Sequence, residues 1–145
     1  MSATLSAVQL AEGRRLRMRH LTIVPGLAIA VFASTVAGEH GLGLVPLLLF
    51  GILPHLPVLL GVGQPTVRGQ LAPRAVPLFN AMHHPAVPLT LLAVAATGVI
   101  SAFWLVGAMA WLGHVVVDWG MGDGLRSADG HRLSPARRLI GVGGR

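Results

Sequence analysis

Long apolar segments with almost no charged residues are the feature that most restricts how this chain can fold. Four of them occur, at residues 21–38, 44–62, 75–97 and 101–119. A helix needs roughly 20 apolar residues to cross the hydrocarbon core of a bilayer, and each segment is close to that length. Only 11% of the 145 residues are charged, whereas about a quarter is usual in soluble domains. The sequence therefore predicts an all-α integral membrane bundle of four transmembrane helices.

The basic residues predict the orientation of these helices. All eleven are arginines, and they precede the first span, lie between the second and third, or follow the fourth. Because short cytoplasmic loops are enriched in basic residues, we expect both termini and the middle loop to be cytoplasmic. The expected location is a bacterial inner (plasma) membrane, crossed several times. The arginines are Arg14, Arg15, Arg17, Arg19, Arg68, Arg74, Arg126, Arg132, Arg137, Arg138 and Arg145.

Three regions are expected along the chain. Residues 1–20 form a basic N-terminal interfacial segment, residues 21–126 the transmembrane domain, and residues 127–145 an Arg-rich cytoplasmic tail. The net charge of +6 does not indicate nucleic-acid binding, because the arginines flank the apolar segments instead of forming one basic stripe. Membrane lipids are the expected partners.

Polar and ionisable side chains interrupt three of the apolar segments. His55 lies in the second span, Asn80 and His83 in the third, and His114 and Asp118 in the fourth. Counted from the cytoplasmic ends at ~1.5 Å per residue, His55 and His83 lie on the order of 12 Å deep and His114 about 9 Å deep. Because an ionisable group inside a span costs at least a few kcal/mol, this common depth predicts one shared site.

The spacing within each span also favours a single site. Asn80 and His83 are three residues apart, and His114 and Asp118 are four apart, so each pair shares a helical face. His84 diverges from His83 by about 100° around the helix axis. We therefore expect His84 to pack against a neighbouring helix, or to donate a hydrogen bond to backbone that Pro88 has freed.

Imidazole and carboxylate groups without any cysteine suit a divalent metal, with zinc the first choice and manganese or iron the others. His83, His114 and Asp118 are the expected ligands, with His55 as a fourth ligand or a general base and Asn80 as an orienting donor. Such a site would hydrolyse a lipid-type ester or phosphoester at the cytoplasmic leaflet.

From about residue 48 to residue 132 the chain resembles a small four-helix bacterial membrane family catalogued as domain of unknown function 4260. The motifs that carry the resemblance are "PH" at 54–55, "FNAMH" at 79–83, "GHVVVDW" at 113–119, "GDGLR" at 122–126 and "GH" at 130–131. That family is similar to the LexA-regulated, membrane-bound metal-dependent hydrolases. The resemblance implies a cytoplasm-facing metal site that comprises Asn80, His83, His114, Asp118 and His131.

The chain also departs from that family's pattern. His55 stands where the family has aspartate, Phe79 and Asp123 stand at tyrosine positions, and Trp119 replaces an arginine. The change at position 55 removes a negative charge, which disfavours a two-metal site or changes the metal.

Two further functions remain open. The chain could be a non-catalytic accessory subunit of a larger membrane complex, with histidines that ligate haem or a chlorophyll-type pigment. Its small-residue segments "AVAATG" (93–98) and "GAMAWLG" (107–113) would then pack against helices of partner subunits. A proton- or ion-conducting element fits less well, because the polar groups occupy only the cytoplasmic half of the spans.

Overall fold

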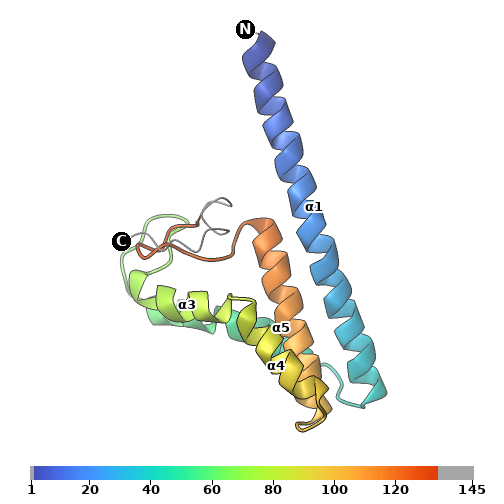
Figure 1. Cartoon of the computed structure of the whole chain (residues 1–145). Coiled ribbons are helices and arrows are strands. Elements are labelled where there is room, and N and C mark those ends of the chain that lie inside the picture. The colour runs from blue at the N-terminus through green and yellow to red at the C-terminus, as the bar shows by residue number, and fades with distance from the viewer. Residues whose placement is uncertain (1, 134–145) are drawn as a thin grey trace.

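The computed structural model describes residues 2–133, with side chains described from residue 21 onward. Within that range the protein is helical and contains no β-strand, which agrees with the predicted all-α class. Figure 1 shows a long first helix beside a bundle of shorter ones. The helices are α1 (Ser2–Glu39), α2 (Val45–Ile52), the 3₁₀ helices η1 (Leu53–Gly61) and η2 (Pro73–Ala75), α3 (Val76–Met82), α4 (Ala86–Ala96) and α5 (Ala102–Met121).

Three helices in the described range are long and apolar enough to cross a membrane, so the expectation of four spans is corrected. They are Leu21–Glu39, Pro73–Ala96 and Ala102–Met121, and they coincide closely with the predicted first, third and fourth spans. The predicted second span, 44–62, is instead a shorter apolar helix, Val45–Gly61. Its α-helical part ends at Ile52, because Pro54 and Pro57 lack the backbone N–H that an α-helix requires.

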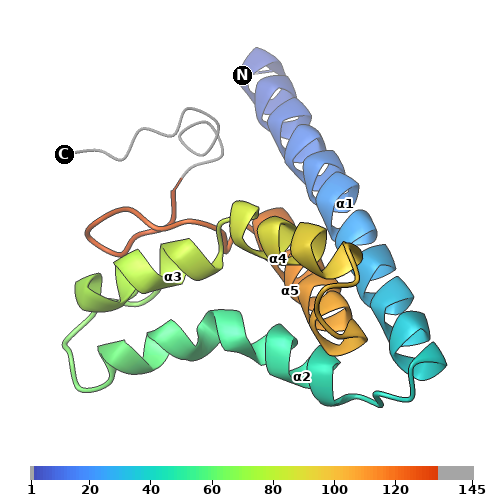
Figure 2. The same cartoon turned by 60° about the horizontal axis from the view of Figure 1, so that its bottom comes forward.

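Helices α1 and α5 run side by side in opposite directions (Figures 1 and 2). Glycines bring the two backbones together. A Cβ on Gly113 would lie 2.9 Å from the carbonyl oxygen of Gly26, and a Cβ on Gly26 would lie 2.7 Å from Val117. This close approach between small residues is typical of membrane helix pairs.

The segment "GAMAWLG", expected to face a partner subunit, is used inside this chain. Most of it is buried, and a Cβ on Gly107 would overlap the ring of Phe50 in α2. Phe50 belongs to a buried cluster with Ala110, Trp111 and Val115. One face of α5 therefore packs on α1 and another on α2.

The third predicted span is interrupted in its middle. Helix α3 ends at Met82 and α4 begins at Ala86, and the two point in different directions in Figure 1. Pro85 explains the break, since it offers no N–H to the preceding turn and disfavours the α conformation of the residue before it. His83, the C-cap of α3, lies at this break.

The loop before α3 and the segment after α5 lie together at one end of the bundle. Gln70 donates from Nε2 to the carbonyl of Asp129 at 2.7 Å, and the N–H of Leu71 donates to the carbonyl of Gly130 at 3.0 Å. An isolated antiparallel bridge joins Arg126 to Arg132.

The predicted tail is described only as far as residue 133, and residues 134–145 lie outside the described range. The backbone of residues 2–20, expected to form a separate interfacial segment, continues into the first span within α1.

Candidate metal centre

His83 is held at the break between α3 and α4 with no exposure to solvent. Its ring Nδ1 lies 3.0 Å from the carbonyl oxygen of Phe79, and its Nε2 lies 3.2 Å from Oδ2 of Asp118. A carbonyl oxygen only accepts hydrogen bonds, so Nδ1 must carry the proton. In the neutral ring, Nε2 then directs a lone pair at a carboxylate oxygen, and two acceptors at this distance repel each other unless a cation or a second proton lies between them.

His114 and Asp118 lie one turn apart on α5. Asp118 is only 4% exposed, and the Nε2 of His114 lies 3.3 Å from the same Oδ2 atom that His83 approaches. Despite this short distance, the buried Nε2 of His114 makes no hydrogen bond. Its one polar contact is thus a poorly aligned approach to the carboxylate, and a coordinated ion would give this nitrogen a well-directed partner.

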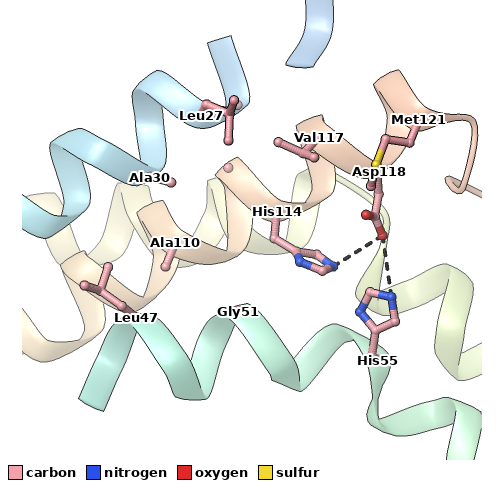
Figure 3. A pocket seen from close by; sticks show the side chains of 12 residues that line it. Leu27, Ala30, Leu47, Gly51, His55, Ala110, His114, Val117, Asp118 and Met121 are labelled. Carbon is pink, nitrogen blue, oxygen red and sulfur yellow. Dashed lines mark ion pairs between the residues drawn. The ribbon is translucent and has the colours of Figure 1, made fainter. Parts of the chain in front are cut away.

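His55 approaches the carboxylate from η1, on the other side of the site (Figure 3). Its Nε2 lies 3.8 Å from Oδ2 of Asp118, and its side chain is 50% exposed. The flanking Pro54 and Pro57 are buried, and they hold the 3₁₀ turn that points this imidazole inward. His55 is therefore the most loosely held and most accessible of the three histidines.

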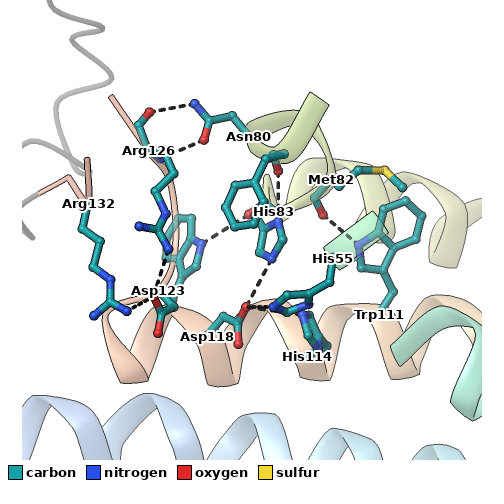
Figure 4. Close-up of polar contacts among 12 residues, drawn as sticks. His55, Asn80, Met82, His83, Trp111, His114, Asp118, Asp123, Arg126 and Arg132 are labelled. Carbon is teal, nitrogen blue, oxygen red and sulfur yellow. Dashed lines mark hydrogen bonds and ion pairs between the residues drawn. The ribbon is translucent and has the colours of Figure 1, made fainter. Parts of the chain in front are cut away.

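Together these side chains form a group that could hold a metal ion, as predicted. Their ligand atoms all lie within 4.8 Å of one another, and Figure 4 shows the three rings around the carboxylate. Ligands of a tetrahedral zinc ion, each about 2.0–2.1 Å from the metal, lie about 3.4 Å apart. The distances from Oδ2 to the three Nε2 atoms are 3.2, 3.3 and 3.8 Å. This His/Asp cluster consists of His55, His83, His114 and Asp118.

Asn80, predicted as an orienting donor of the site, binds backbone instead. Its Nδ2 donates to the carbonyl of Arg126 and its Oδ1 accepts from the N–H of Arg126, each at 2.8 Å. This two-point contact fastens the segment after α5 onto α3. The same segment places the guanidinium of Arg126 over the ring of Phe79, 5.5 Å from its centre, and Phe79 stacks on His83 at 3.8 Å. Asn80 thus supports the cluster indirectly, because it fixes the segment that places Arg126 against Phe79.

Two tryptophans on α5 also hold His83 in place, and sequence reasoning did not identify them. Trp111 donates from Nε1 to the carbonyl of Met82 at 2.8 Å, and Trp119 donates to the carbonyl of His83 at 3.3 Å. The break at Pro85 leaves these two carbonyls without helical partners. The sequence did contain a signal for these contacts: Pro85 interrupts one apolar span and frees carbonyls, and the next span carries two tryptophans that can donate to them.

His131, which the resemblance implied as a ligand, and His84, which was not expected to be one, both lie apart from the cluster. His131 pairs with Asp129 in the loop after α5, where Nδ1 and Oδ2 are 3.1 Å apart and the imidazole is 54% exposed. His84 is exposed, and its Nδ1 accepts a hydrogen bond from the N–H of Ala86 at 3.3 Å. The proposed separation of His83 from His84 therefore agrees with their burial, although His84 bonds to backbone beside Pro85 and not beside Pro88.

Fold and site together define an all-helical protein with membrane-length apolar helices and a buried His/Asp cluster suited to a metal ion. No protein-family model, curated protein or solved structure matches the chain. The resemblance drawn from the motifs thus stays a prediction.

Proposed function

We propose that this protein is a membrane metal-dependent hydrolase, with a divalent ion held by the His/Asp cluster and a lipid-type ester or phosphoester as substrate. The observation that carries the proposal is the contact between Nε2 of His83 and Oδ2 of Asp118. The hydrogen bond from Nδ1 to a backbone carbonyl is the usual way in which a metal-ligating histidine is oriented. The membrane is proposed to be a bacterial inner membrane, with the cluster facing the cytoplasm.

Zinc fits this donor set best. His83, His114 and Asp118 offer two imidazole nitrogens and one carboxylate oxygen, a set that zinc accepts in tetrahedral geometry with its fourth position open, and the chain has no thiolate to offer. Manganese and iron accept the same donors and are the alternatives. An ion would also neutralise the charge of Asp118, whose burial in an apolar bundle is otherwise costly.

The unequal positions of the three histidines favour catalysis over a purely structural site. His83 and His114 lie 3.2 and 3.3 Å from the carboxylate oxygen, whereas His55 lies at 3.8 Å and is half-exposed. A catalytic zinc site keeps three protein ligands and leaves its fourth position open. His55 is thus placed to act as a general base at the open side.

Hydrolysis at this site adds one water molecule across the ester. A divalent ion held by His83, His114 and Asp118 would supply Lewis acidity, polarising the ester oxygen and making a nearby water more acidic. His55 accepts a proton from this water, whose oxygen forms a bond to the acyl carbon or phosphorus. The bond to the alkoxide breaks, and the proton passes from His55 to the departing oxygen. The products are an acid and an alcohol.

A haem or chlorophyll-type pigment fits this geometry less well than a small ion. One face of His83 is covered by Phe79, and its Nε2 points into the space that Asp118, His55 and His114 share. A macrocycle ligated by this nitrogen needs a wide flat space there, and the three side chains occupy it. The accessory-subunit alternative also loses one supporting feature, since "GAMAWLG" packs within the chain.

The test uses the full chain purified in maltoside micelles. We expect about one zinc, manganese or iron ion per chain by elemental analysis, and loss of that metal in Asp118→Asn. Hydrolysis of p-nitrophenyl carboxylic and phosphate esters should stop on chelation and return with the metal. His84→Ala is the matched control, because this exposed histidine neighbours the cluster without joining it. Protein that holds no metal, or that shows a Soret or far-red absorbance band, would contradict the proposal.

A further inference from the structure

Two cavities of different character meet at His55. One, of about 590 Å³, extends between α1, α2 and α5 and reaches His55, His114 and Asp118 at one end (Figure 3). The other, of about 330 Å³, lies on the opposite side, beneath the loop before α3 and the segment after α5. His55 lines both. A ligand that occupied both cavities would therefore pass directly beside the His/Asp cluster.

The larger cavity suits an alkyl chain. Apart from the cluster residues at its end, its lining is apolar and includes Leu27, Leu47, Ala110 and Met121. Its volume lies within the range of about 300–1,000 Å³ that is usual for ligand pockets. Leu27 and Met121, which line this cavity, are also exposed. A lipid chain in a surrounding bilayer could enter between them.

The smaller cavity suits an anion. Two guanidinium groups, from Arg126 and Arg132, share one carboxylate oxygen of Asp123 at 3.0 and 2.6 Å. Two positive charges face one negative charge, so this pocket carries a net positive charge. The two-point contact of Asn80 with the Arg126 backbone fixes the segment that carries both arginines. Guanidinium groups bind phosphate and carboxylate oxygens with high specificity.

Two other arginines near the predicted cytoplasmic face do not contribute to this pocket. Arg74 donates to the carbonyls of Leu60 and Val62 at the end of η1. Arg68 is exposed and lines neither cavity.

From this arrangement we propose that the site binds an anionic amphiphile, with its alkyl chain in the apolar cavity and its anionic group at Arg126 and Arg132. The inference names the substrate class of the proposed hydrolase and rests on that function. The scissile bond then lies at the junction between chain and anionic head, beside His55. The shared chemistry is a long alkyl chain joined through an ester bond to a phosphate or to a group that carries a carboxylate.

The test measures binding and needs no turnover. Radiolabelled dodecyl phosphate is bound to the full chain in maltoside micelles by scintillation proximity, with metal present and after chelation. Competition with dodecyltrimethylammonium tests whether binding depends on the head-group charge. Competition with inorganic phosphate tests whether the alkyl chain of the ligand contributes to binding. We expect saturable binding that unlabelled dodecyl phosphate displaces, that inorganic phosphate displaces only at much higher concentration, and that the cationic amphiphile does not displace.

Two variants address the two cavities separately. Arg132→Gln leaves Asp123 paired with Arg126 and should weaken dodecyl phosphate binding about tenfold, with Arg68→Gln as the control of equal charge change. Gly51→Leu fills the apolar cavity, because Gly51 lines it and a Cβ there meets no atom within 4 Å. It should also weaken binding about tenfold while leaving competition by inorganic phosphate unchanged.

The outcomes separate this inference from the proposed function. If the cationic amphiphile competes equally, or if both variants bind dodecyl phosphate like the wild type, the inference that the site binds an anionic amphiphile is refuted. This holds even where metal and hydrolysis are present. If inorganic phosphate competes as well as dodecyl phosphate, the ligand is a free anion and the chain-binding part is refuted. Dodecyl phosphate binding that responds to both variants supports the inference, and it can be observed in protein whose metal content disproves the hydrolase.

Discussion

Trp119 donates its indole N–H to the backbone carbonyl of His83, 3.3 Å away, and so connects the end of α5 to the break in the third span. His83 is the C-cap of α3, and its backbone N–H still donates to the carbonyl of Phe79 at 2.9 Å, but its own carbonyl lies beyond the end of that helix. Its imidazole is positioned by the Phe79 carbonyl on one side and its backbone by Trp119 on the other.

This relationship predicts that Trp119→Phe weakens both the fold and the metal site. Loss of one neutral hydrogen bond costs about 0.5–1.5 kcal/mol, which should lower the thermal midpoint measured by circular dichroism in micelles. Metal affinity should fall about tenfold, in line with other groups that orient a ligand without touching the ion. Unchanged metal affinity in Trp119→Phe would mean that Phe79 alone positions the ring.

The two adjacent histidines should behave differently on substitution. His83 is fully buried and faces Asp118, whereas His84 is exposed and bonds only to the N–H of Ala86. We expect His83→Ala to abolish stoichiometric metal binding and His84→Ala to keep it, both measured by elemental analysis. Loss of the metal in His84→Ala but not in His83→Ala would show that His84, and not His83, is the ligand.

The glycine contacts predict a strong dependence of stability on α1–α5 packing. A Cβ at Gly113 would lie 2.9 Å from the carbonyl oxygen of Gly26 and 3.3 Å from the backbone nitrogen of Ala30, so neither atom can move aside cheaply. Gly113→Ala should destabilise the bundle by about 1–3 kcal/mol. Gly38→Ala is the matched control, because a Cβ there meets nothing within 4 Å, and it should be neutral or stabilising by up to about 1 kcal/mol. Equal thermal midpoints for both variants would contradict the close packing.

The positions of the loops predict the sidedness of the chain. Residues around Arg68 and Asp129 lie together, joined by hydrogen bonds between their loops, and the surplus of arginine predicts that they are cytoplasmic. The chain has no native cysteine, so single cysteines can be introduced directly. We expect Arg68→Cys and Asp129→Cys to resist a membrane-impermeant maleimide in whole cells. Ser101→Cys should react, because Ser101 lies between the two spans that separate these loops in the chain. Opposite labelling of the Arg68 and Asp129 variants would contradict the loop contact itself.

Much of the cluster could be inferred from the sequence, because depth along a span and spacing on a helix are both local properties. Counting residues placed His55, His83 and His114 at one level, and the structure brings their ring nitrogens around Asp118. The shape of the second apolar segment could not be inferred in the same way. Its hydropathy resembles that of a span, but Pro54 and Pro57 convert half of it to a 3₁₀ helix.

The role of Asn80 was beyond local reasoning for a different reason. Its partner, the backbone of Arg126, is 46 residues away, and a contact with backbone leaves no trace in the identity of the partner residue. The carbonyl of Phe79, only four residues from His83, also leaves no trace in the identity of the residue that carries it. Sequence spacing showed which face these residues share, but only the folded chain shows that Asn80 binds backbone and His83 binds the carboxylate.

His55 provides the sharpest test of catalysis against simple metal storage. Its imidazole is the most exposed of the three and the farthest from Oδ2 of Asp118, at 3.8 Å, and it lines both cavities. If it is the general base, His55→Ala should keep the metal, with an affinity reduced by about tenfold or less, and lose most of the hydrolysis, since positioned general bases contribute about 10²–10⁴-fold. Truncation there opens space beside the cluster, so added imidazole should restore part of the rate to His55→Ala and none to His83→Ala. If His55→Ala instead loses the metal as completely as His83→Ala, all four side chains are ligands, the fourth position is closed, and the site stores or senses the ion without hydrolysing an ester.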